Sequence, residues 1–163
     1  MNIVNDPTSA ATLYGIAGGH IHRSFDKGMT WDAAPWTPPG MVGSISDLII
    51  RDSLFMIVTR SGDVPLRTRD GGKTWAPMYS LTAVANHGFD MEYSWSGKTL
   101  AISTVAGRTL VWVSTDDGDS WVDESGDYTA LSGGIAQWYD NKLFVSSMGQ
   151  GIAAKVFNET ETV

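Results

Sequence analysis

Acidic side chains outside any repeated motif are the first candidates for chemistry in this sequence. Asp47, Asp52, Asp90 and Glu92 lie in or beside short apolar runs. Two carboxylates about 6.5 to 9.5 Å apart across a cleft can hydrolyse a glycosidic bond, one as acid and the other as base. The sequence indicates no pairing between these four residues. We therefore interpret them as solvated acids of turns and strand edges, and we predict no catalytic residue.

Histidine spacing offers a possible metal site. His20 and His22 are separated by one residue, so on a strand both imidazoles project from the same face, which is half of a metal site. A third ligand would have to come from elsewhere, and the remaining histidine, His87, is distant in sequence. A polar strand face explains the pair better, and we expect no metal and no cofactor.

A run of acids in the third quarter of the chain could bind Ca²⁺, because oxygen-rich turns hold this ion. Its members are Asp116, Asp117, Asp119, Asp123, Glu124 and Asp127. The run lacks the spacing of a known calcium loop and contains no basic residue. We interpret it as a solvated acidic edge that discourages aggregation between sheets.

Four tryptophans, Trp36, Trp95, Trp112 and Trp138, offer a different chemistry. Exposed indole rings can stack against sugars, but aromatic residues in strands also pack between sheets. The sequence leaves both interpretations open. The identity of any binding residue is therefore unknown at this stage.

The motif S/T-x-D-x-G-x-S/T-W occurs three times, at starts separated by ~45 residues, a period that suits the blade of a β-propeller. Five positions are defined in each copy. They are Ser24, Asp26, Gly28, Thr30 and Trp31 in the first copy, Thr68, Asp70, Gly72, Thr74 and Trp75 in the second, and Ser114, Asp116, Gly118, Ser120 and Trp121 in the third.

The residue types of this motif suit a tight turn between two strands. The aspartate can accept hydrogen bonds from backbone N–H groups ahead of it, and the glycine can take a positive φ. The hydroxyl residue helps to satisfy the same turn, and the tryptophan can pack between neighbouring sheets. A carboxylate occupied in this way has a lowered pKa and is a poor general acid or base. We therefore predict a structural role for the three motifs.

The elements that carry the motifs are short strands separated by Gly- and Pro-rich turns. The second period illustrates the plan, with strands predicted over residues 45–52, 54–60, 64–70 and 73–78. Four such periods span residues 1–38, 41–82, 85–128 and 130–163, and the last ends in a degenerate fourth motif over residues 156–163. The predicted fold is all-β, a single small β-propeller domain of about four four-stranded antiparallel blades with these motifs as turns.

The three motifs resemble the Asp-box, or BNR, repeat of sialidase-like β-propellers, and the resemblance spans nearly the whole chain. It implies four-stranded blades around an axis, with the boxes on the outer turns. It does not imply one activity, because this scaffold serves hydrolases, receptors, assembly factors and phage structural proteins. A sialidase also needs three arginines, a Tyr–Glu nucleophile pair and an aspartate, and the Arg-Ile-Pro sequence that usually carries the first arginine does not occur.

Composition and charge exclude or disfavour several classes of function. The formal net charge is −7, which disfavours binding to nucleic acid or to an anionic membrane surface. There is no cysteine, which excludes disulfides and thiolate chemistry. We see no signal peptide and no apolar run long enough to span a bilayer, so we expect a soluble protein.

These observations favour a non-catalytic propeller that binds or assembles with other proteins or with itself. A bacteriophage virion component, of the tail, fibre or capsid, is the setting we favour by analogy with the family. The alternative is a carbohydrate-active module, either a glycan binder or a reduced glycoside hydrolase. Four periods can close as a ring in one chain, or partner chains can complete it.

Overall fold

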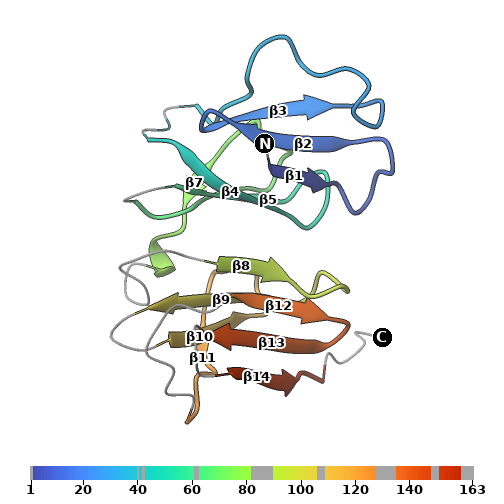
Figure 1. Cartoon of the computed structure of the whole chain (residues 1–163). Helices are drawn as coiled ribbons and strands as arrows, with labels where there is room; N and C mark the ends of the chain where they lie inside the picture. The colour runs from blue at the N-terminus through green and yellow to red at the C-terminus, as the bar shows by residue number, and fades with distance from the viewer. Residues whose placement is uncertain are drawn as a thin grey trace. The chain divides into compact units, whose positions relative to one another are not determined.

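The computed structural model describes residues 2–39, 41, 43–60, 63–81, 90–105, 109–127, 135–147 and 151–158. These residues form four antiparallel sheets, which confirms the predicted all-β class (Figure 1). The described strands of each sheet fall inside one predicted period. The chain divides into two compact units, Met1–Met78 and Tyr79–Val163, and each unit contains two sheets. The single-domain arrangement stays a prediction.

The first unit contains sheets 1 and 2. Sheet 1 has the order β1 (Asn2–Asn5), β2 (Leu13–Ala17) and β3 (His20–Ser24). Sheet 2 has the order β4 (Ile45–Ile50), β5 (Met56–Arg60), β6 (Leu66–Thr68) and β7 (Ala76–Pro77). Their facing sides share one apolar core, which consists of Tyr14, Ile21, Ile45, Leu48, Ile50, Met56, Val58 and Leu66.

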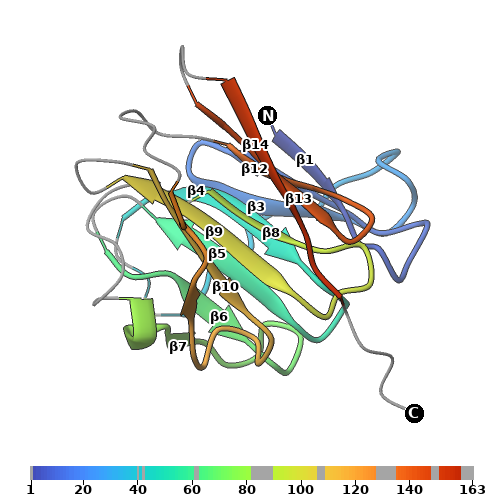
Figure 2. The same cartoon turned by 90° about the horizontal axis from the view of Figure 1, so that it is seen from below.

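The second unit begins with a single 3₁₀ turn, η1 (Tyr79–Leu81), followed by sheets 3 and 4. Sheet 3 has the order β8 (Asp90–Tyr93), β9 (Leu100–Val105), β10 (Thr109–Ser114) and β11 (Val122–Asp123). Sheet 4 consists of β12 (Ala136–Tyr139), β13 (Lys142–Ser147) and β14 (Gly151–Val156), which lie side by side in Figure 2. Their shared core comprises Ala101, Val111, Val113, Ala136, Trp138, Leu143 and Val145. No helix among the described residues is long and apolar enough to cross a membrane.

Sheet 1 differs from the prediction of four strands, because its outer segment forms only an isolated bridge between Ile21 and Trp36. The N–H groups of Asp32 and Trp36 donate to the carbonyls of Arg23 and Ile21 at 2.8 and 2.7 Å. The neighbouring Pro35 has no N–H and cannot extend the ladder. Side chains complete the attachment, since Arg23 Nε donates to Asp32 Oδ2 at 2.7 Å.

Sheet 4 has three described strands, and most of the predicted fourth motif, residues 159–163, lies outside the described residues. Val156, where that motif is predicted to begin, pairs with Lys142 at the start of β13, as Thr68 pairs with Met56 at the start of β5. Val156 is exposed, whereas the first residues of the three complete motifs are buried. Lys155 pairs with buried Leu143 and lies on the face toward sheet 3. The start of the fourth motif stays a prediction.

Candidate functional site

Each Asp-box turn is closed by its own aspartate. In the first box, Asp26 Oδ1 accepts the Ser24 hydroxyl and the Thr30 N–H, both at 2.8 Å, and Asp26 Oδ2 accepts the Thr30 hydroxyl at 2.6 Å. The Ser24 hydroxyl oxygen in turn accepts the N–H of Gly28 at 2.8 Å. Gly28 has a φ of 86°, in the left-handed region that favours glycine.

The same bonds recur in the other two boxes, where the N–H groups of Thr74 and Ser120 donate to Asp70 and Asp116 at 2.9 and 2.8 Å. The hydroxyl of Thr74 lowers the pKa of Asp70 to about 2. Partial burial of Asp116 opposes its ionisation, but the bonds from Ser120 and Ser114 outweigh it and lower the Asp116 pKa to about 2. Both carboxylates are ionised near neutral pH and carry no proton to donate.

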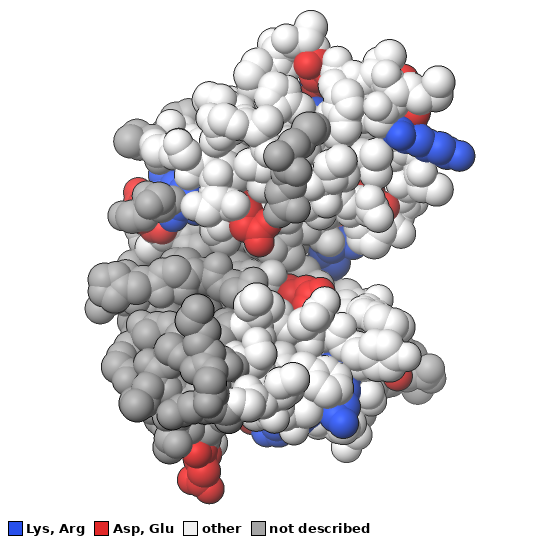
Figure 3. All heavy atoms as spheres, viewed as in Figure 1, with Lys and Arg blue, Asp and Glu red and all other residues white. Residues whose placement is uncertain are grey.

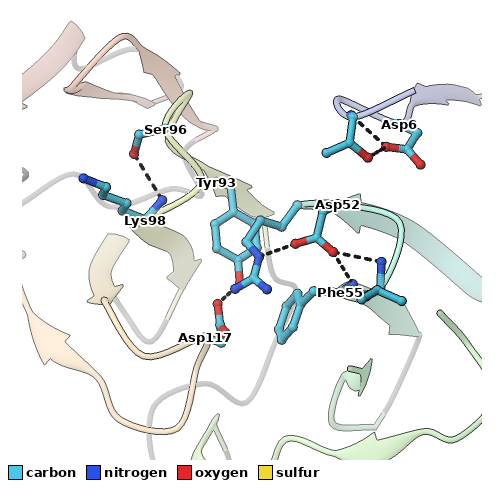
Figure 4. A network of polar contacts seen from close by, with 10 residues as sticks. Asp6, Asp52, Phe55, Tyr93, Ser96, Lys98 and Asp117 are labelled. Carbon is cyan, nitrogen blue, oxygen red and sulfur yellow. Dashed lines mark hydrogen bonds and ion pairs between the residues drawn. The ribbon is translucent and has the colours of Figure 1, made fainter. Parts of the chain in front are cut away.

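The carboxylates outside the boxes take separate positions. Asp52 closes the β4–β5 turn, where its Oδ1 accepts the N–H groups of Leu54 and Phe55 at 2.8 Å (Figure 4). Asp47 is half-buried on β4, and this burial raises its pKa. Glu92 Oε2 accepts the N–H of Trp138 at 2.8 Å and so links β8 to β12. The Asp90 side chain lies outside the described residues.

These positions correct the interpretation as solvated acids for Asp47 and Glu92. Asp52 is a turn acid as predicted, but Asp47 is half-buried and Glu92 is used as a link between two sheets. The Asp47 side chain is partly screened from solvent, because β4 packs in the core of the first unit. Asp47 and Asp52 belong to the first unit and Glu92 to the second.

His20 and His22 lie on the same face of β3, as alternate residues of a strand must. His20 is exposed and His22 is half-buried. His87 lies outside the described residues. Within the described ranges, no group of three His, Cys, Asp or Glu side chains is placed to hold a metal ion.

The acidic run has partners that its sequence did not indicate. Asp117 Oδ1 accepts the Tyr93 hydroxyl at 3.0 Å (Figure 4). Asp123 Oδ1 accepts the N–H of Ser125 at 2.8 Å. Glu124 forms an ion pair with Lys155 of β14, 31 positions along the chain. The face in Figure 3 shows charged side chains scattered among uncharged ones.

Of the four tryptophans outside the boxes, two pack in the cores, one is half-buried and one is exposed. Trp36 packs against the first-unit core, with ring centroids 5.7 Å from Trp75, and Trp138 is buried in the second. Trp112 is half-buried on β10. Trp95 is different, because it is 65% exposed and lies 4.9 Å between ring centroids from Tyr139, which is 66% exposed.

This Trp95–Tyr139 pair joins two hairpins of neighbouring sheets in the second unit. Trp95 lies in the turn that follows β8, and Tyr139 ends β12 just before the β12–β13 turn. The rings are tilted by 60°, so they form an angled aromatic surface rather than a flat one. Trp95 is a candidate from the sequence, but Tyr139 is not. Their contact depends on how the two sheets pack, which no local pattern indicates.

A cavity of about 150 Å³ lies between the outer parts of sheets 3 and 4. Buried Val111, Leu143 and Val145 line one part of it, and Ala153 and Phe157 another. Glu124 and Lys155 contribute the charged part of the lining. No local sequence pattern signals this cavity, because its walls come from separate segments spread over residues 111–157.

Comparisons with known proteins identify the fold but not a family. No family model and no curated protein matches this sequence. Solved structures do match, at 13–17% identity. An ancestral GH74 enzyme has a TM-score of 0.69 at 15% identity over 94% of this chain and 22% of that chain. The GH74 xyloglucanase from Xanthomonas campestris has a TM-score of 0.62 at 17% identity, over 93% and 28% of the two chains.

YCF48 from Cyanidioschyzon merolae is similar at a TM-score of 0.60 and 13% identity, over 97% of this chain and 56% of that chain. Another YCF48 structure, with a bound D1 peptide, has a TM-score of 0.57. This chain therefore spans between about a fifth and just over half of the length of these structures. At these identities the likeness shows the fold alone, and the chain has an all-β, propeller-like fold with Asp-box turns.

Proposed function

We propose that this chain is a non-catalytic propeller module that assembles with protein partners or with itself. The observation that carries the proposal is the use of its carboxylates. The three box aspartates are each occupied by three donors, and Asp52 and Glu92 also accept backbone N–H groups. Groups held in this way use their lone pairs on the chain's own donors, which makes them poor candidates for a general acid or base.

Exposed apolar side chains support the assembly role. In the second unit they include Ile135, Ile152 and Val156 as well as the Trp95–Tyr139 pair, all more than half exposed. Aromatic and aliphatic residues of this kind anchor protein interfaces. One of the similar solved structures, YCF48, holds a bound peptide, which is the kind of ligand an assembly module takes. A bacteriophage virion component is the setting we favour.

Light scattering at several protein concentrations tests the proposal, because the monomer mass is 17.6 kDa. We expect a defined mass above this value that rises toward a fixed multiple with concentration. A mass of 17.6 kDa at every concentration would contradict self-association. The assembly role would then depend entirely on other proteins, and carbohydrate binding would become the stronger candidate.

Carbohydrate binding is the second candidate function, and the exposed Trp95–Tyr139 pair favours it. Exposed aromatic rings stack on the apolar faces of sugars, and a bound sugar would cover their exposed surface. Oligosaccharide titration followed by tryptophan fluorescence tests this function. A saturable shift that Trp95→Ala abolishes and Trp36→Phe retains would favour it, whereas no shift up to millimolar sugar would exclude it.

A further inference from the structure

The cavity between sheets 3 and 4 occupies a position that is filled in the first unit. Trp36 and Glu124 are equivalent residues, because each donates its N–H to the carbonyl three residues before an Asp box. The acceptors are Ile21 and Val111, at 2.7 and 2.8 Å. Trp36 lies directly over the next box, where a Cβ added to Gly72 would be 1.9 Å from its Cζ2 atom.

Glu124 does not fill the corresponding space in the second unit. Its carboxylate pairs with Lys155 of β14, and apolar walls remain behind the pair. These walls include Val111, Leu143 and Phe157, and the cavity volume of about 150 Å³ suits one aromatic ring. Phe157 already packs edge-on against Trp138 at 5.2 Å, so an incoming ring would meet an aromatic wall.

The edge of sheet 4 next to the cavity is open among the described residues. β14 pairs with β13 on one side only, and five of its six residues are exposed. The equivalent strands β6 and β10 each carry a short antiparallel fourth strand, β7 and β11. A tryptophan, Trp75 or Trp121, immediately precedes each of those strands. Sheets 2 and 3 therefore show what completes such an edge.

We propose that β14 and the adjacent cavity form a binding site for an extended peptide segment of a partner protein. The segment adds to β14 as an antiparallel strand, and its backbone bonds to the N–H and C=O groups of β14 that point away from β13. A large aromatic side chain at the start of the segment enters the cavity beside Phe157. This inference deepens the proposed assembly function and rests on it.

The chain itself supplies a suitable probe, because residues 70–78 contain a box turn, Trp75 and β7. We expect the synthetic peptide Asp70–Met78 to bind the full chain saturably, with one peptide per chain, in isothermal titration calorimetry. A control peptide with Trp75→Ala should bind at least tenfold more weakly, because it leaves the cavity unfilled. Equal binding of both peptides, or no binding at millimolar peptide, would overturn the proposal.

Two variants of β14 locate the site. Ala153 pairs with Val145 and lines the cavity, whereas Ile152 is 73% exposed. We expect Ala153→Leu to fill the cavity and weaken peptide binding at least tenfold, and Ile152→Leu to change it less than twofold. Thermal unfolding and circular dichroism establish that both variants are folded. Unchanged binding by a folded Ala153→Leu variant would overturn the assignment of the cavity.

The same variants separate this inference from the proposed function. If Ala153→Leu abolishes both peptide binding and an oligomer seen by light scattering, the site is supported and its occupant is a second copy of the chain. If the oligomer persists while wild-type protein binds no peptide, assembly holds but uses another surface, and this site is wrong.

Discussion

The two units solve the same packing problem in different ways. Between sheets 1 and 2, Trp36 covers Gly72 of the second box and contacts Trp75, so aromatic rings fill the outer part of the interface. Between sheets 3 and 4, the Glu124–Lys155 ion pair stands beside a cavity instead. The second Asp box thus accepts a large ring from the preceding sheet at its glycine.

The largest expected effect on stability comes from placing a methyl group at Gly72, against the indole ring of Trp36. Gly72→Ala should destabilise the protein by on the order of 3 kcal/mol, because the methyl group meets the indole and the backbone has a φ of 83°. Gly126→Ala is the matched control, since Gly126 also has a positive φ but no described atom within 4 Å of the added carbon. It should cost about 1 kcal/mol. Urea unfolding measures both, and equal losses would contradict the packing argument.

The box carboxylates should make stability dependent on pH. Their folded pKa values, about 2 for Asp70 and Asp116, lie below the ordinary value of 3.8. Their contribution is therefore complete above about pH 5 and is lost as the pH falls through 3.8 toward 2. Denaturant unfolding between pH 6 and pH 2 measures this loss.

Asp116→Asn should remove part of that dependence and cost about 2 kcal/mol near neutral pH, because an amide NH₂ in place of Oδ2 cannot accept the bond from the Ser120 hydroxyl. Asp127→Asn, at an exposed turn position, is the matched control and should change stability by less than about 0.5 kcal/mol. An Asp116→Asn variant with the wild-type pH profile would show that the box bonds contribute little.

The ion pair of the second unit should have the smallest effect. Lys155 is 55% exposed, so we expect Lys155→Met to cost less than about 1 kcal/mol, with a difference that shrinks in 1 M salt. Unfolding in low and high salt checks this expectation. A loss of several kcal/mol that salt does not change would mean that the ion pair holds sheets 3 and 4 together as Trp36 holds sheets 1 and 2.

The sequence predicted the parts of this structure that depend on local patterns. Three complete boxes indicated antiparallel sheets at a ~45-residue period, and the described strands fall within those periods. The degenerate fourth motif over residues 156–163 stays a prediction, because most of it lies outside the described residues. Sequence inspection also could not show that Trp95 meets Tyr139 or that Glu124 meets Lys155, because both contacts join different sheets.

Amide hydrogen exchange at two protein concentrations tests the difference between the two units most directly. We expect β14 amides that do not bond to β13 to exchange faster than those of β6 at low concentration, because β7 covers β6. At high concentration, or with the Asp70–Met78 peptide, β14 should become protected while β6 does not change. Equal protection of β14 and β6 under every condition would contradict an open edge in sheet 4.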